Sequence, residues 1–208
     1  MLFDTMSRVA EALTFSRDAF DLLNLKESLV VLALATSAQA LGQSVILALN
    51  RVGALRFILA LVAIALSHAL SALVMVVGAV VAGGLLLAAP LRLEPTLSVF
   101  ALAFAPRLFS PLVIAPYVGE GIERGIDIWV MLLVVFGLYH GLELHLAASA
   151  TVAALGWLSL RITNRLLGRP LGRALRRLER WLLGSGRLTF ADIPDALLEI
   201  ARGHGARR

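Results

Sequence analysis

The chain has 208 residues, of which 59% are hydrophobic and only 16% charged, with a mean hydropathy of +0.87 and a formal net charge of +5. This composition is far more apolar than that of a soluble domain, and the length leaves room for about four to six membrane segments but no large soluble domain. Since the chain has no cysteine, disulfides, iron–sulfur clusters and thiolate metal sites are excluded. We therefore expect an all-α fold, a polytopic membrane helix bundle.

The first 27 residues alternate apolar and charged positions at helical spacing. Phe3, Met6 and Val9 fall on one side of such a helix, and Ser16 could cap a second helical turn. We expect residues 1–27 to form an amphipathic segment that lies on the membrane surface. The alternative is a short soluble helix that packs on its own loops.

A first span of ordinary length, Leu29 to Leu49, carries several polar residues. Thr36, Gln39 and Gln43 are spaced three and four apart, so they form one stripe on a helix. This stripe should face protein or water. Such amides usually hold helices together, with about 0.6 kcal/mol on average for each interhelical hydrogen bond, and a polar pathway is the alternative.

The longest apolar stretch runs from Phe57 to Ala89, and Ser67, His68 and Ser71 are its only polar side chains. A helix of this length spans ~50 Å, whereas the hydrocarbon core of a bilayer is about 30 Å thick. We expect a transmembrane rod on which the rest of the molecule packs. His68 is interpreted as a neutral packing histidine, with a proton relay as the alternative.

Small residues recur four apart along this rod. Gly78 with Ala82 and Ala79 with Gly83 form two small-xxx-small pairs. Such pairs let a neighbouring helix come close.

Residues 96–116 are apolar but make a poor simple span. Pro106, Pro111 and Pro116 interrupt them, and Arg107 lies near the middle. A charge there costs about 2.5 to 3.5 kcal/mol on insertion scales. We expect two short helices that form a re-entrant hairpin, with Arg107 reaching an interface or a carboxylate; a full crossing is the alternative.

A polar loop is expected at Gly119 to Gly125, followed by a fourth apolar segment from Asp127 to Tyr139 and a fifth from Leu146 to Leu160. Both apolar segments are short, so we expect a tight helical hairpin.

The densest polar cluster, His140, Glu143 and His145, lies between these two segments. It is a weak metal-site candidate, because it lacks the HExxH arrangement and Gly141 should break the helix. A polar turn at the interface is the preferred interpretation. No Walker loop, GxSxG or GxGxxG is present, so we expect no enzymatic activity and no cofactor.

Eleven of the nineteen Lys and Arg residues lie from Arg161 onward. We expect residues 167–208 to form a basic amphipathic tail at the cytoplasmic face that binds anionic lipid of the inner leaflet. A solvated helix that binds a protein is the alternative, and nucleic-acid binding is disfavoured because aromatic interleaving is absent. The expected lipid-binding residues are Arg169, Arg173, Arg176, Arg177, Arg180 and Trp181.

The orientation rule favours the re-entrant model for the transmembrane domain, residues 28–166. If the proline-rich segment does not cross, both termini face the cytoplasm and only Arg51 and Arg56 among the basic residues lie outside. If all five segments cross, Arg8, Arg17 and Lys26 lie outside instead. The rule therefore predicts four crossings.

Residues 10 to 165 resemble the Ypt-interacting-protein (Yip) family in its bacterial form. The motifs are a Phe ahead of the first span, the Ala-Phe-Ala-Pro step of the third segment and the Gly-Leu-x-x-Gly-Leu step between the last two. The resemblance implies a small multi-span protein without an enzymatic site; eukaryotic relatives act in membrane traffic and bind small GTPases. The short N-terminal region and long basic tail depart from that pattern and speak against GTPase binding.

Two functional hypotheses follow. The first is a non-enzymatic accessory, scaffold or membrane-organising protein of the bacterial inner membrane that binds partner membrane proteins and anionic lipid. The second is a small transporter or channel with a polar path through the bundle. The residues that would line such a path are Thr36, Gln39, Gln43, His68, Arg107 and Asp127.

Overall fold

The computed structural model describes residues 2–21, 24–49, 54–87, 90–114 and 119–183. The described part of the chain is all-α, as expected from the sequence. Its elements are α1 (Leu2–Leu13), α2 (Asp18–Asp21), α3 (Leu25–Leu49), α4 (Ala54–Leu86), α5 (Leu93–Ala103), the 3-10 helix η1 (Ala105–Ile114), α6 (Gly119–Gly141) and α7 (Leu146–Leu183).

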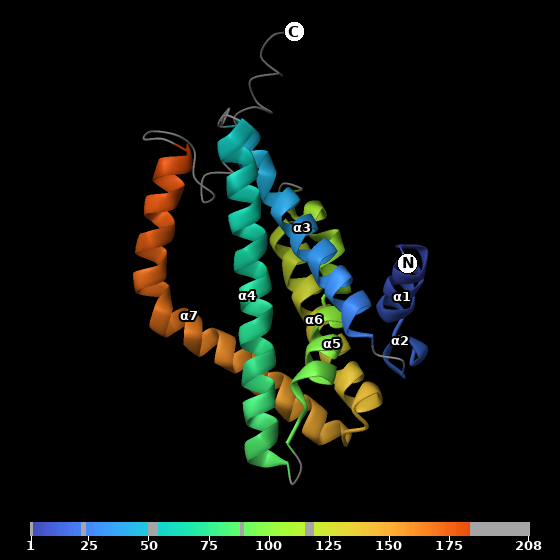
Figure 1. Cartoon of the computed structure of the whole chain (residues 1–208). Coiled ribbons are helices and arrows are strands. Elements are labelled where there is room, and N and C mark those ends of the chain that lie inside the picture. Colours follow the sequence, from blue (N-terminus) through green and yellow to red (C-terminus); the bar gives the residue numbers. More distant parts are fainter. Residues whose placement is uncertain (1, 22–23, 50–53, 88–89, 115–118, 184–208) are drawn as a thin grey trace.

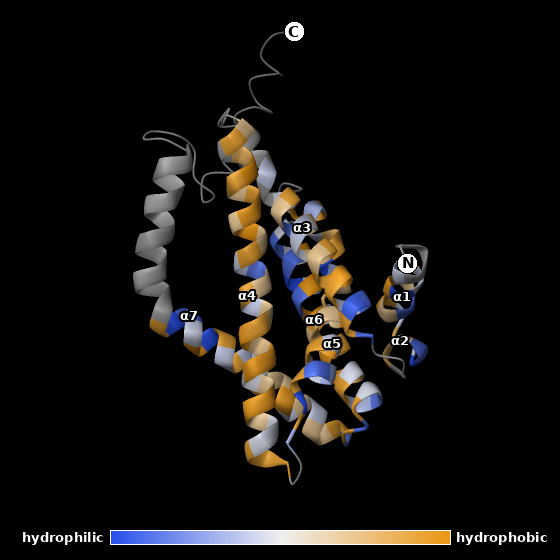
Figure 2. Cartoon of the chain, viewed as in Figure 1, coloured by the Kyte–Doolittle hydropathy of each residue, from blue (hydrophilic) through white to orange (hydrophobic). Residues whose placement is uncertain are grey.

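Three stretches of the described residues are long and apolar enough to cross a membrane. They comprise 30 residues of α4, 21 residues of α5 and η1 together, and 21 residues of α7. Figure 2 shows hydrophobic colouring along most of α4. These lengths and compositions indicate an integral membrane protein.

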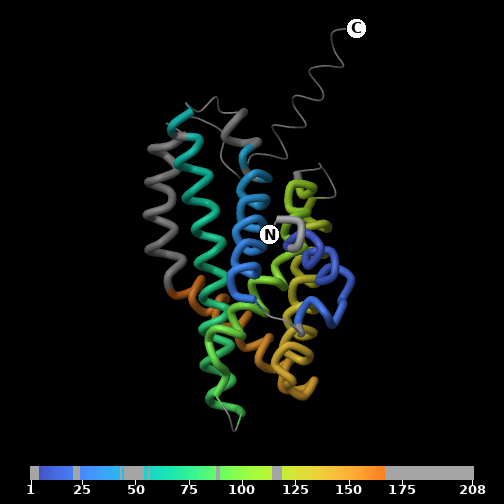
Figure 3. Tube along the Cα trace, turned by 45° about the vertical axis from the view of Figure 1, so that its right-hand side comes forward, coloured from blue at the N-terminus to red at the C-terminus, as the bar shows by residue number. Residues whose placement is uncertain are grey.

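Successive long elements alternate in direction. In Figure 1, α4 descends from the end of α3 to the start of α5, and α6 descends to the start of α7. Between them, α5 and η1 rise together past α3, as the green trace in Figure 3 shows. The two short helices expected in residues 96–116 are present, but the described residues do not confirm that they form a re-entrant hairpin.

Helices α5 and η1 form the centre of the bundle. Of the 18 most apolar consecutive residues within Leu93–Val113, 61% are buried, compared with 11% of the corresponding 18 residues in α4. Packing is therefore organised around α5 and η1, which contact α3, α4 and α6, and not around the long rod α4. Pro106 explains why α5 ends, because it lacks the N–H that would bond to the Leu102 carbonyl oxygen and continue the α-helix.

The N-terminal helices pack into the bundle. Phe20 is completely buried, and the ring of Phe136 on α6 meets it edge-on at 5.8 Å. A β-carbon on Gly137 would lie 2.6 Å from the Phe20 ring, so the glycine provides the notch that accepts it. Arg8 also forms an ion pair with Glu27 at 2.7 Å. The N-terminal segment is thus held by the protein itself and not by a membrane surface alone.

Two expected boundaries were wrong. The polar stretch Gly119 to Gly125 is the first part of α6 and not a loop; Arg124 and Glu120 form an ion pair one turn apart, which supports the helix. The fifth segment was expected to end at Leu160, but α7 continues through Pro170 to Leu183 and so includes the first part of the tail expected from residue 167. Figure 1 shows a bend in α7, as expected for a helix that contains a proline. Residues 184–208 lie outside the described residues.

Candidate functional site

An ion pair joins η1 and α6. Arg107 donates a hydrogen bond from its guanidinium to a carboxylate oxygen of Asp127. The Arg107 side chain is 18% exposed, whereas that of Asp127 is 53% exposed. Because a carboxylate lies beside the guanidinium, Arg107 does not face hydrocarbon as an isolated charge.

Aromatic residues next to this pair join the same two elements. The rings of Phe109 and Trp129 are stacked, with centroids 6.1 Å apart and planes inclined by 8°. Arg107 Nε and Trp129 Nε1 are buried and have no hydrogen-bond partner among the described residues. This region therefore combines a charged pair, an aromatic stack and two unused donors.

The other residues of the expected polar path are distributed differently. The hydroxyl of Thr36 lies 2.9 Å from the carbonyl oxygen of Leu32, so it is satisfied within its own helix. Gln39 is half-buried on α3, and the side chain of Gln43 lies outside the described residues. His68 is half-buried on α4, within electrostatic reach of Arg107.

The described side chains thus bring Arg107 and Asp127 together, and of the other residues of the expected path only His68 is in electrostatic range of Arg107. The hydroxyl of Thr36 bonds to the backbone of its own helix and not to Arg107 or Asp127. A path through the bundle would have to be built on the Arg107–Asp127 pair.

A second site lies where α4 meets α7, and it occupies the small-residue face of the rod. A β-carbon on Gly156 of α7 would lie 2.8 Å from the Met75 carbonyl oxygen and 3.3 Å from the Ala79 β-carbon. One on Gly78 would lie 2.0 Å from the Ser159 hydroxyl. The small residues of α4 therefore admit another helix of the same chain. Of the remaining small residues, Ala82 is buried and Gly83 lies against Leu91.

Ser159 links the two backbones at this contact. Its hydroxyl lies 3.2 Å from the Val74 carbonyl oxygen on α4 and 2.6 Å from the Gly156 carbonyl oxygen on its own helix. Its single proton can be donated to either oxygen. The contact thus combines close backbone approach with a hydroxyl bond, a combination typical of membrane helix pairs.

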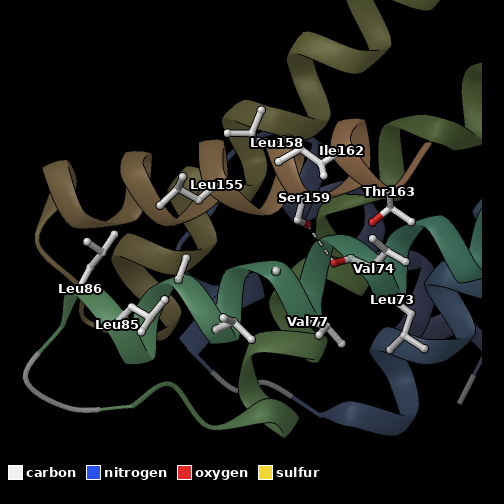
Figure 4. Close-up of a pocket in the computed structure, with 13 residues that line it drawn as sticks. Leu73, Val74, Val77, Leu85, Leu86, Leu155, Leu158, Ser159, Ile162 and Thr163 are labelled. Atoms are coloured by element: carbon white, nitrogen blue, oxygen red, sulfur yellow. Dashed lines mark hydrogen bonds between the residues drawn. The ribbon is translucent and has the colours of Figure 1, made fainter. Parts of the chain in front are cut away.

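An apolar groove of about 620 Å³ opens beside this contact. Figure 4 shows Leu86 and Leu155 toward one end, and Leu73 and Thr163 toward the other. All of its lining residues come from α4 and α7, and hydroxyls of Ser159 and Thr163 are its polar side-chain groups. The groove has the size and apolar character of a ligand site, but no charged residue lines it.

The weak metal-site candidates do not converge. The His140 ring packs against Phe136 and Tyr139, and Glu143 is exposed with a positive φ of 53°. His145 Nδ1 accepts the Ala147 N–H at 3.3 Å and so caps the start of α7. Among the described residues, no group of three His, Asp or Glu side chains could hold a metal ion.

The basic residues expected to bind lipid lie partly outside the description. The backbone of α7 carries Arg169, Arg173, Arg176, Arg177, Arg180 and Trp181, but their side chains are not described. Earlier on the same helix, the described basic residues are Arg161 and Arg165, and both are exposed. The guanidinium of Arg161 lies over the Trp157 ring, 4.5 Å from its centroid.

Sequence reasoning missed the roles of Phe20, Gly137 and Ser159. The Gly-Leu steps around Gly137 were noticed as a motif, but nothing in the sequence paired that glycine with an aromatic ring 117 positions earlier. Ser159 carried no local signal, since a serine in an apolar helix usually bonds its own backbone.

Comparison of the chain with protein-family models, with curated proteins and with solved structures finds no match. The functional conclusions therefore depend on the geometry of the chain itself.

Proposed function

We propose that the protein is a non-enzymatic accessory or scaffold subunit of the bacterial inner membrane, which binds partner membrane proteins and anionic lipid. We assign the C-terminal tail to the cytoplasmic side, because basic residues that flank a span are concentrated on that side of the membrane. The resemblance to the Yip family implies the same class of function.

The observation that carries this proposal is the exposed apolar row along α4. Leu59, Leu66 and Leu70 recur at helical spacing and are each 45% to 64% exposed. Gly78 and Ala79 of α4 are covered by α7, whereas this row remains available to another helix. In a membrane such a row contacts lipid or a neighbouring protein, and we propose the latter.

Photo-crosslinking along α4 tests the proposal. A photoreactive amino acid is placed in the row at Leu66, and the matched control is Val76 on the same helix, which is fully buried. We expect adducts with another membrane protein from Leu66 and none from Val76. Adducts with lipid alone from Leu66 and from the rest of the row would contradict the proposal.

A transporter or channel is the second candidate, and the Arg107–Asp127 pair favours it. An ion pair next to an irregular helix is a common feature of solute pathways. Proton and potassium flux in liposomes tests this candidate. Flux that is abolished in Asp127→Asn and retained in Glu120→Gln would replace the accessory role with transport.

A further inference from the structure

We propose that the groove between α4 and α7 binds one acyl chain of an anionic phospholipid, whose phosphate lies at Arg165. This inference rests on the lipid-binding part of the proposed function and assigns it a site on described residues. It does not depend on the exposed row of α4 or on a protein partner.

The groove fits a hydrocarbon chain in length and chemistry. Its α4 wall runs from Leu73 to Leu86, which corresponds to about 20 Å of helix. The lining is aliphatic apart from the hydroxyls of Ser159 and Thr163, and Ser159 already lies within bonding distance of backbone carbonyls. A chain would therefore enter without leaving a strong polar group unsatisfied.

The groove is open along one side. Leu73, Val77 and Val81 line it and are still 43% to 54% exposed. On α7, Leu158 lines the opposite wall and is 44% exposed. Since only two helices form the walls, a chain can enter sideways from the surrounding bilayer.

The positive charge of Arg165 favours an anionic headgroup and determines at which end of the groove that headgroup lies. Arg165 lies three residues beyond Ile162 and seven beyond Leu158, so it continues the row that lines the groove. Residues 54–86 and 146–166 contain no Asp or Glu, and Arg165 forms no ion pair with any described residue. A phosphate would supply the missing negative charge.

The surroundings of Arg165 suit a headgroup. The apolar stretch of α7 ends at Leu166, and Arg161 and Trp157 form a cation–π pair one turn earlier. Arginine and tryptophan at the end of a span are typical of the level of the headgroups. The basic run that begins at Arg169 follows on the same helix.

The test uses full-length protein in phosphatidylcholine vesicles that contain phosphatidylglycerol with a photoreactive acyl chain. Adducts are mapped by mass spectrometry of the digested protein. We expect adducts concentrated on groove residues such as Leu158 and Val77, at levels well above those on Leu132 of α6, which is 53% exposed outside the groove. Excess unlabelled phosphatidylglycerol should suppress them, and excess phosphatidylcholine should not.

Two variants and one control test the occupant. Leu158→Trp fills the groove and should abolish the concentrated adducts, whereas Leu132→Trp should leave them unchanged. Arg165→Gln should lower the preference for phosphatidylglycerol by about fivefold, the factor expected for loss of one basic side chain at an anionic surface. Circular dichroism confirms that each variant is folded.

Three outcomes would overturn the inference: adducts spread evenly over the groove and Leu132, equal labelling by phosphatidylcholine and phosphatidylglycerol probes, or a protein crosslinked in the groove in place of lipid. Partner crosslinks from Leu66 are scored in a parallel sample. Their absence beside a lipid-filled groove would overturn the accessory role alone, and their presence beside an empty groove would overturn this inference alone.

Discussion

At Gly156, the absence of a β-carbon allows α7 to approach α4 closely. The position that a β-carbon would take is 2.8 Å from the Met75 carbonyl oxygen, and that oxygen belongs to helix backbone that cannot rotate away. Small residues at this contact thus determine the separation of two helices that both count as candidate spans.

Replacement of Gly156 by leucine should therefore force the helices apart. We expect a loss of about 1 to 3 kcal/mol in the free energy of unfolding, the usual cost of overpacking. Titration with a denaturing detergent in mixed micelles measures it. Gly84→Leu is the matched control, because nothing lies within 4 Å of its added β-carbon. Equal stability of the two variants would show that the α4–α7 contact is not close-packed.

The Arg107–Asp127 pair is a second feature at the scale of single residues. Asp127→Asn should leave the mostly buried Arg107 without a charged partner. Because Asp127 is half exposed, we expect a cost of about 1 to 2 kcal/mol, between the values for surface and buried pairs. A double-mutant cycle with Arg107→Gln measures the coupling.

Glu120→Gln on the same helix is the control for this cycle, since both partners of the Glu120–Arg124 pair are at least 75% exposed. It should change stability by less than about 0.5 kcal/mol. A coupling between residues 107 and 127 as small as this would mean that the pair contributes nothing to the packing of η1 on α6.

At the scale of elements, the N-terminal helices show how an apparently peripheral segment becomes part of the core. Val9, Ala12, Ala19 and Phe20 all join the main hydrophobic cluster. The sequence predicted helical structure here from periodicity, but periodicity identifies an apolar face without identifying what covers it. Membrane and protein are equally apolar partners for such a face, so the docking on α6 could not be predicted.

Phe20→Ala should release this segment. Loss of a fully buried aromatic side chain costs about 3 to 5 kcal/mol, and here it removes the group that fills the notch at Gly137. We expect faster tryptic cleavage after Arg17 in nanodiscs, measured against uncleaved protein over time. Phe15→Ala is the control, because Phe15 is 36% exposed. Equal cleavage of the two variants would indicate that Phe20 does not hold the segment in place.

The remaining elements show where the local sequence is enough to predict a helix and where it is not. The rod expected from Phe57 to Ala89 corresponds to α4 at Ala54–Leu86, because an uninterrupted apolar run leaves few alternatives to a helix. The start of α6 was missed because its glycines and charged residues are typical of a loop. Glu120 and Arg124 are four residues apart, so they can form an ion pair only if the segment is helical. The central position of α5 and η1 was also missed, because the long rod was expected to be the element on which the rest of the molecule packs.

At the scale of the whole molecule, charge distribution and helix direction lead to different topologies. The orientation rule favours a proline-rich segment that enters and leaves the membrane on one side. In the structure, α5 begins beside the C-terminal end of α4, and η1 rises from there toward the level at which α6 begins (Figures 1 and 3).

Single-cysteine labelling decides between these topologies, and the absence of native cysteine makes it direct. Arg92→Cys and Gly121→Cys lie at the two ends of the α5–η1 segment, and both positions are exposed. We expect a membrane-impermeant maleimide to label them from opposite sides of sealed vesicles, because a segment that traverses the bundle in one direction separates its ends. Labelling of both from the same side would restore the re-entrant hairpin and place both termini on one side. Cysteines in place of Ala54 and Pro90, which lie at the two ends of the candidate span α4 and are both exposed, serve as the control pair.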